Sequence, residues 1–269
     1  MKAQSTASKS RRLSWPLAMA AALLSGPVLA GEPAEPNAAA ILKDMANFLA
    51  GLQNFACTSR NGYEVLQSSG QKIEFGETRR MTVARPGRLR VEEVSSDGAQ
   101  DVALFDGKLV TVFNADEGVY AQAPQPPAVD DALMYFTREL HMRMPLALLL
   151  STRVRTDLAA MVKKLDYVES TEILGIPAHH IAGRTDTVDF QMWIAEGNRP
   201  LPLRVVITYT HEPGQPRFWS DITDWNTNPR FPSSVWQLAL PAGARGIPFA
   251  VQLAAPNAGS QAATGEVKP

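Results

Sequence analysis

The chain has 269 residues, with 26 basic residues against 27 acidic ones and a hydrophobic share of 45%. This balance provides no basic surface of the kind that nucleic acids attract, so it argues against nucleic acid as a partner. The single cysteine, Cys57, excludes an internal disulfide, and a hydrophobic core must therefore hold the fold together. Cys57 follows Phe55 and Ala56 in an apolar run and is interpreted as a small core residue rather than a nucleophile.

Residues 1–30 have the three regions of a secretory signal peptide. A basic start precedes a mostly apolar stretch at 13–29, and Val28-Leu29-Ala30 offers the small residues that precede cleavage. Pro16 and the Ser25-Gly26-Pro27 turn make a permanent membrane span the weaker interpretation. We expect cleavage after Ala30 and export to the periplasm. Because residues 1–30 hold four basic and no acidic residues, the mature chain has 22 basic and 27 acidic residues, a net charge of −5.

A helix and a long β-hairpin are predicted first. Asn37 can cap a helix, because apolar residues then recur at helical spacing as far as Leu52. Residues 55–66 and 72–84 alternate between apolar and polar types around a Ser68-Ser69-Gly70 turn. This pattern predicts two antiparallel strands with one face toward water.

Three further short strands are predicted to continue the hairpin as an antiparallel meander. Leu89, Val91 and Glu93 alternate with arginine or glutamate, which is the period of a strand with one drier face. Asp106-Gly107 separates two apolar runs, and such a pair is the strongest short-range signal for a hairpin.

A helical insert is predicted after three closely spaced prolines end the meander. Apolar residues recur at helical spacing over 129–144, and a second helix is predicted at 156–165. The methionines of this insert have two interpretations. They provide a flexible lining for a ligand, or they fill an ordinary core.

A second β block is predicted from Tyr167 onward, with strands in 168–182, 188–194, 201–209 and 218–225 and a final edge segment around 235–240. The order is then helix, long meander, helical insert, second meander. The fold class is α+β and mainly β. Residues 31–250 are expected to form one domain, and 251–269, rich in Ala, Gly, Ser and Gln, a disordered tail.

No residue pattern predicts catalysis, a cofactor or a metal ion. His179 and His180 are adjacent and would point to opposite faces of a strand, while His141 and His211 lie far away in the sequence. Asp221 and Asp224 would also point to opposite faces, which argues against a pair of catalytic carboxylates. Nucleophile-elbow, phosphate-loop and dinucleotide motifs are not found, so we expect a protein that is not an enzyme.

Large apolar residues at alternating positions, together with the apolar side of the insert, favour a sheet that curls around a cavity roofed by helices. Periodicity alone does not distinguish this cavity from a filled core. The residues expected to line it are Leu89, Val91, Leu104, Phe113, Phe136, Leu140, Met144, Phe190 and Met192.

Several short motifs occur in an order that resembles a known superfamily. They are Arg85-Pro86 at a strand start, Asp106-Gly107-Lys108 before Val112-Phe113-Asn114, Trp193 before Leu201-Pro202-Leu203, and Phe231 before Pro241-Ala242-Gly243. Over residues 37–247 the chain resembles the LolA/LolB/LppX superfamily of lipoprotein and lipid carriers, and it looks most similar to a family of predicted periplasmic proteins within it.

The resemblance implies an incompletely closed antiparallel β-barrel, with a helical lid over an apolar cavity that holds acyl chains. It also implies that Arg85, directly before Pro86, bonds to the lid at carbonyls within 129–165 and governs its opening. The alternative for Arg85 is an ordinary solvated charge at a strand end. Leu89 and Val91 are smaller than the aromatic residues typical of the carrier, so lipoprotein as the cargo is not carried over.

Three functions follow as hypotheses. The first is a periplasmic carrier or binding protein for a lipid, acyl chain or lipoprotein, working as a monomer with a membrane-bound donor or acceptor protein. The second is a periplasmic regulatory or sensor module that binds a lipoprotein or peptide. The third and weakest is a hydrolase, which would require groups such as His180 and Asp189 to converge in a pocket.

Overall fold

The computed structural model describes residues 36–254. The signal peptide expected at 1–30 and residues 255–269 of the expected tail lie outside this range. Residues 251–254 of that tail belong instead to a short helix, so its expected start is corrected. Within the described part, the elements in chain order are α1 (Ala38–Gly51), β1 (Asn54–Leu66), β2 (Lys72–Ala84), β3 (Arg88–Ser95), β4 (Gln100–Phe105), β5 (Leu109–Asn114), β6 (Val119–Pro124), α2 (Val129–Met134), the π-helix η1 (Tyr135–Glu139), α3 (Ala147–Leu150), α4 (Val154–Met161), β7 (Lys164–Ile173), β8 (Ile176–Arg184), β9 (Val188–Ala195), β10 (Pro202–Tyr209), β11 (Arg217–Asn226), the 3₁₀-helix η2 (Ser233–Trp236), β12 (Arg245–Gly246) and α5 (Ala250–Ala254).

One sheet contains all the strands of residues 36–254, in the order β12-β6-β5-β4-β3-β2-β1-β11-β10-β9-β8-β7. Neighbouring strands are antiparallel, except that the two residues of β12 run parallel to β6. The pairing of β1 with β11 joins the two meanders, while β12 and β7 stand at opposite ends of the sheet. The mainly β fold with an incompletely closed antiparallel sheet is therefore confirmed.

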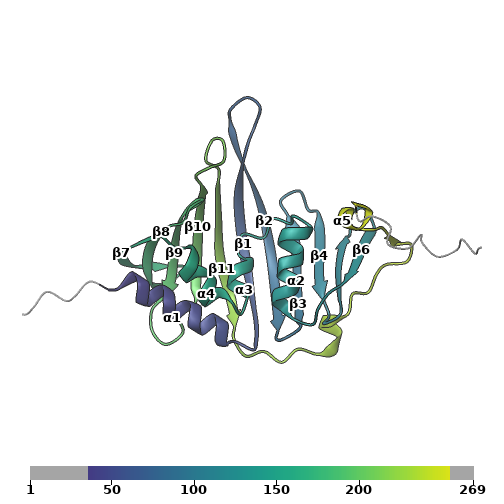
Figure 1. Cartoon of the computed structure of the whole chain (residues 1–269), viewed down its shortest axis with the longest axis horizontal. Helices are drawn as coiled ribbons and strands as arrows, with labels where there is room; N and C mark the ends of the chain where they lie inside the picture. The colour runs from purple at the N-terminus through teal and green to yellow at the C-terminus, as the bar shows by residue number, and fades with distance from the viewer. Residues whose placement is uncertain (1–35, 255–269) are drawn as a thin grey trace, which may run out of the picture. The chain divides into compact units, whose positions relative to one another are not determined.

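The helices α1 to α4 lie over one face of this sheet, which we call the inner face (Figure 1). The core is formed there: Leu89 of β3, Ile181 of β8 and Ile222 of β11 are buried together with Met45 and Leu49 of α1 and with residues of the insert. Residues 235–237 lie on the opposite, outer face, where Arg90 of β3 donates to the carbonyls of Val235 and Gln237 at 3.4 Å.

Local signals explain most element boundaries. The side-chain oxygen of Asn37 accepts from the N–H groups of Ala39 and Ala40, so α1 begins where its cap was predicted. At the predicted hairpin, Gly107 has φ +101°, and the Asp106 carboxylate accepts from the N–H of Lys108 at 2.9 Å. Such a positive φ is the conformation that glycine adopts without steric cost.

Three predicted elements differ from the structure. The helix expected at 156–165 spans Val154–Met161, and Lys164 and Leu165 already belong to β7. The helix expected at 129–144 becomes α2 followed by a π-helix that ends at Glu139, where the Thr137 hydroxyl bonds back to the Leu133 carbonyl. Such back-bonding competes with the regular helical ladder. The strand expected at 235–240 is also wrong, because Ser233–Trp236 forms a 3₁₀-helix and β12 pairs only at Arg245 and Gly246.

Candidate functional site

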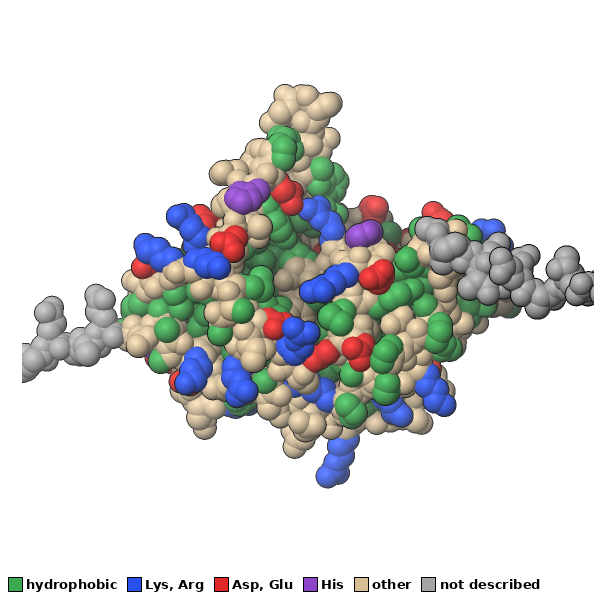
Figure 2. All heavy atoms as spheres, in the orientation of Figure 1, with side chains coloured by type: hydrophobic (Ala, Val, Ile, Leu, Met, Phe, Trp, Pro, Cys, Tyr) green, Lys and Arg blue, Asp and Glu red, His purple; other side chains and the backbone are tan. Residues whose placement is uncertain are grey.

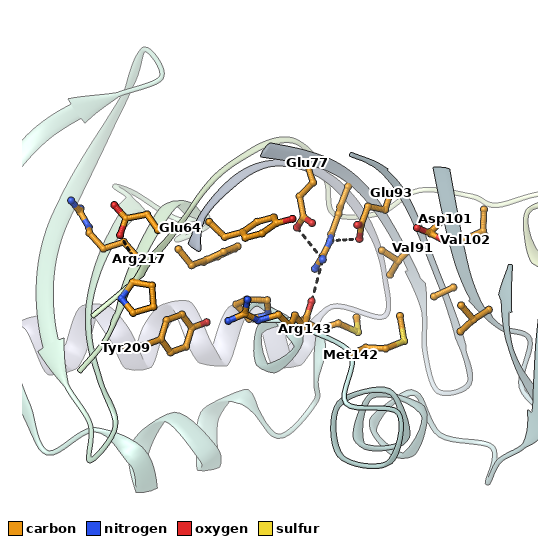
Figure 3. A pocket seen from close by; sticks show the side chains of 18 residues that line it. Glu64, Glu77, Val91, Glu93, Asp101, Val102, Met142, Arg143, Tyr209 and Arg217 are labelled. Atoms are coloured by element: carbon orange, nitrogen blue, oxygen red, sulfur yellow. Dashed lines mark hydrogen bonds and ion pairs between the residues drawn. The ribbon is translucent and has the colours of Figure 1, made fainter. Parts of the chain in front are cut away.

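A hollow of about 510 Å³ lies between the inner face and the insert, and we refer to it below as the hollow. Its walls come from β1 to β5, from β10 and β11, and from residues 142–145 of the insert (Figure 3). Its apolar lining includes Val91, Ala103, Val112, Met142, Met144 and Phe218. The volume is within the range of pockets that bury small ligands.

Two of the residues predicted to line a cavity, Val91 and Met144, line the hollow. Leu89, Phe136 and Met192 lie instead in the core beside it and are almost fully buried.

Leu140 and Phe190 lie elsewhere. Leu140 lines a neighbouring pocket with Met142 and Phe249. Phe190 is buried in β9, where its ring fills the place of a side chain at Gly183: a Cβ atom there would lie 2.2 Å from the ring.

The prediction was wrong for Leu104 and Phe113, which lie on the outer face. The pairing of β3 with β4 places Leu104 opposite Arg90, and Phe105 opposite Leu89. Residues paired in this way point to the same side of a sheet, so Phe105 is the inner residue of β4. By the same alternation along β5, Val110 and Val112 face inward, and Phe113 does not.

The sheet side of the hollow is charged as well as apolar. Glu77 and Glu93 both bind Arg79, with nitrogen–oxygen distances of 2.9 and 2.8 Å, and the same guanidinium donates to the carbonyl of Arg143 in the insert at 3.1 Å. Asp101 lies opposite Glu93 in the sheet and accepts from the Asn114 amide at 3.0 Å. The bond from Arg79 to Arg143 therefore joins the sheet to the insert across the hollow.

Burial affects two of these carboxyl groups in the same direction. It raises the pKa of the Glu93 carboxyl above its ordinary value, and the attraction of Arg79 opposes this only in part. Burial also raises the pKa of the Asp101 carboxyl, against the hydrogen bond from Asn114. Burial therefore makes the charged form of both carboxyl groups less favourable than it is in water. The sequence analysis missed them as site residues, although Glu93 had the same alternation as Leu89 and Val91.

Arg85 lies at the end of β2, where its guanidinium joins α1 to the insert. One nitrogen, Nη1, donates to the carbonyls of Leu49 at 2.9 Å, Ala50 at 3.1 Å and Leu52, all at the C-terminus of α1. The other, Nη2, donates to the carbonyl of Leu150 in α3 at 2.9 Å. Only the last acceptor lies within 129–165, where all of them were expected. A role in gating stays a prediction.

The surroundings of Arg85 are largely apolar. Its guanidinium lies 5.3 Å from the centre of the Phe55 ring. Burial lowers the pKa of Arg85 from its ordinary value, and the charge of Asp130 opposes this. Arg85 is thus a partly buried cation held by carbonyl groups, and the alternative of a solvated strand-end charge is corrected.

Cys57 is buried in β1 with 2% of its surface exposed. Burial, reinforced by the negative charge of Asp224, raises the pKa of its thiol to about 12. A thiolate is the reactive form of cysteine, so this thiol is inert at neutral pH.

We expect a thiol-alkylating reagent to leave the folded protein unmodified and to label it once in urea, as measured by mass spectrometry. Full labelling without denaturant would contradict this burial.

The histidines do not converge on a candidate catalytic centre. His180 stacks on Trp193 with ring centres 4.0 Å apart, and its Nε2 lies 3.1 Å from the Gln191 side-chain oxygen. Asp221 is bound by Arg204 at 2.7 Å. Within residues 36–254, no three His, Cys, Asp or Glu side chains are grouped closely enough to hold a metal ion.

The face that carries the helices has no single dominant charge. Figure 2 shows Lys and Arg side chains interspersed with Asp and Glu and with hydrophobic side chains over this face. Among the described helices, none is both long and apolar enough to span a membrane.

The fold therefore belongs to the class of open antiparallel sheets whose helices cover a hollow large enough for a small ligand. The model of a family described as "Predicted periplasmic protein (DUF2092)" matches residues 38–250. The chain belongs to this family, which confirms the expected membership in a family of predicted periplasmic proteins. No curated protein matches the sequence.

Solved structures with a similar chain arrangement include three named proteins. The lipoprotein LppX of Mycobacterium tuberculosis is 15% identical, with 71% of this chain and 96% of that chain covered and a TM-score of 0.45. LprF of Mycobacterium bovis is 14% identical, with 77% of this chain and 97% of that chain covered and a TM-score of 0.46. A LolA superfamily protein of Nitrosomonas europaea is 10% identical, with 76% of this chain and 98% of that chain covered and a TM-score of 0.35.

Proposed function

We propose that the protein is a periplasmic carrier or binding protein for an amphiphilic ligand, whose apolar chain lies in the hollow. The observation that carries this proposal is the hollow itself, enclosed between Val91, Ala103 and Val112 on the sheet and Met142 and Met144 on the insert. Methionine adapts its shape at low cost, which suits a cover over chains of different length. The family description and the signal-peptide pattern at 1–30 support a periplasmic location.

Binding of this kind is expected to be reversible. Each buried methylene group contributes about 0.8 kcal/mol, so ten of them contribute about 8 kcal/mol. Association costs about 4–15 kcal/mol in lost freedom of motion, which offsets much of this gain. A ligand held with such a small net free energy can pass to a membrane-bound donor or acceptor protein, which is the partner that we propose.

The proposal is tested with an alkyl chain that carries an uncharged fluorescent group. We expect saturable binding to the wild-type protein and at least tenfold weaker binding to Met144→Glu, because the new charge would occupy the apolar side of the hollow. Two lost methylene contacts already amount to about tenfold.

Met134→Glu is the matched control, since Met134 lies in the same insert, is 37% exposed and does not line the hollow. Its binding is expected to equal that of the wild type. An absence of saturable binding to the wild type, or equal losses in the two variants, would contradict the proposal.

A further inference from the structure

Four carboxylates line the hollow, those of Glu64, Glu77, Glu93 and Asp101, together with the guanidinium groups of Arg79, Arg143 and Arg217. Glu64 has partners of its own, because it binds Lys72 at 2.9 Å and accepts from the backbone N–H of Arg217 at 2.9 Å. The other three carboxylates come from neighbouring strands of the inner face, and Arg79 is the cation bonded to Glu77 and Glu93. Figure 3 shows Glu77 and Glu93 directed toward one place from the sheet, with Arg143 and Met142 on the opposite side. The Arg143 side chain is 63% exposed and approaches Glu212 at the rim rather than these three carboxylates.

A second observation comes from beneath the same wall. Ser59 and Asn61 of β1 have 0% and 2% of their surface exposed, and both the Ser59 hydroxyl and the Asn61 side-chain oxygen are buried without a hydrogen-bond partner. They line a cavity of about 10 Å³ that shares Arg79 and Met144 with the hollow. Buried polar groups in native proteins are nearly always hydrogen-bonded, so these two oxygens indicate a place for a donor.

We propose that the hollow is selective for an amphiphile with a protonated amine as its polar end. The ammonium group would lie between Glu93 and Asp101, and the apolar chain would run along Val112, Met142 and Met144. This inference rests on the proposed function and adds to it the chemical class of the ligand.

The chemistry of an ammonium group fits this wall. Glu93 and Asp101 are paired across β3 and β4, so one cation can reach both carboxylates. An ammonium group has three donors and no acceptor, which matches a pair of carboxylates. An anionic head group between Glu93 and Asp101 would instead meet two carboxylates, of which Glu93 alone is bonded to Arg79, and like charges at such distances repel.

The test compares three alkyl ligands of equal chain length that end in an ammonium, a hydroxyl or a carboxylate group. Each competes with the uncharged fluorescent probe. We expect the wild type to bind the ammonium ligand most tightly and the carboxylate ligand most weakly. Glu93→Gln and Asp101→Asn should each lower the ratio of ammonium to hydroxyl affinity about tenfold, the effect of about 1.4 kcal/mol.

Glu117→Gln is the control, because Glu117 is exposed in the turn after β5 and does not line the hollow. Its affinity ratio should equal that of the wild type. A carboxylate ligand bound as tightly as the ammonium ligand, or an unchanged ratio in both wall variants, would overturn the inference. Saturable binding of the uncharged probe would still uphold the proposed function in that case.

The effect of pH provides a further check on the same wall. Because the pKa values of Glu93 and Asp101 are raised, these groups take up protons earlier than ordinary carboxyl groups as the pH falls. The ammonium preference should therefore decrease as the pH falls from neutral into the acidic range, while an alkyl amine stays charged throughout. The other charged groups that face this pair are Glu77, Arg79, Asp116 and Arg143. A preference that is constant over this range would count against the wall as the recognition element.

The amine could come from two sources, a simple long-chain amine or the ethanolamine head group of a phospholipid. Lysophospholipids with ethanolamine and with glycerol head groups on the same acyl chain distinguish them. Tighter binding of the ethanolamine form, lost in Glu93→Gln, assigns the site to a lipid head group. Equal binding of the two, together with an ammonium preference among the simple ligands, assigns it to a free amine.

Discussion

Arg85→Leu is expected to detach the C-terminus of α1 and the short helix α3 from the end of β2. The substitution removes the donor to four carbonyl groups, three at the end of α1 and one at Leu150. A hydrogen bond to a charged group contributes about 1.5–3 kcal/mol, and neighbouring bonds are not additive, so we expect a stability loss of about 3–4 kcal/mol.

Hydrogen exchange of the ligand-free protein measures this effect segment by segment. Amides at the end of α1 and in α2 to α4 should exchange faster in Arg85→Leu, while the central strands β1 and β2 stay protected. Arg80→Leu is the matched control, because Arg80 lies on the same strand and is exposed. Exchange in the insert that equals the wild type would show that Arg85 does not hold the cover, and would remove the gating role implied by the resemblance.

Phe136→Ala is expected to cost a comparable amount of stability by a different route. Phe136 of η1 has 0% of its surface exposed and packs into the core under the insert. Replacing a buried phenylalanine with alanine costs about 3–5 kcal/mol, from lost burial and from the cavity left behind. The insert should then separate from the sheet before the rest of the protein unfolds.

Urea unfolding followed by exchange in α2 and η1 measures the second effect. Met134→Ala, a truncation of an exposed side chain two residues earlier, should change the free energy of unfolding by less than about 0.5 kcal/mol. If both variants lost equal stability, the insert would be packed less tightly than its buried phenylalanine indicates.

Most strands could be predicted because their alternation of apolar and polar residues has the period of a sheet. The same alternation did not identify the correct face for Leu104 and Phe113. Both are large and apolar, but both are also buried, so the outer face of β4 and β5 is dry at these two positions. A strand that is buried on both sides does not show from its own residues which side is inner.

The site was only partly predictable for a related reason. Val91 and Met144 followed from apolar periodicity, whereas the charged wall depends on the register of three strands, which brings Arg79, Glu93 and Asp101 side by side. Alternation within each strand does not fix that register, because a shift of two residues between strands leaves the alternation unchanged. The bonds of Arg85 to α1 join residues more than 30 positions apart, and no local pattern reports such a contact.

The two ends of the sheet have a consequence for how molecules of this protein meet one another. An open sheet has two edge strands, and unpaired backbone groups at an edge can recruit a strand from another molecule. At one end the backbone of β12 occupies part of β6, with the N–H of Ile247 bonded to the Tyr120 carbonyl at 2.8 Å. At the other end β7 carries Lys164, Asp166, Glu169 and Glu172 and has a break in register after Tyr167. Charges and bulges of this kind disfavour edge-to-edge pairing, so the sheet can stay open without joining the sheet of another molecule.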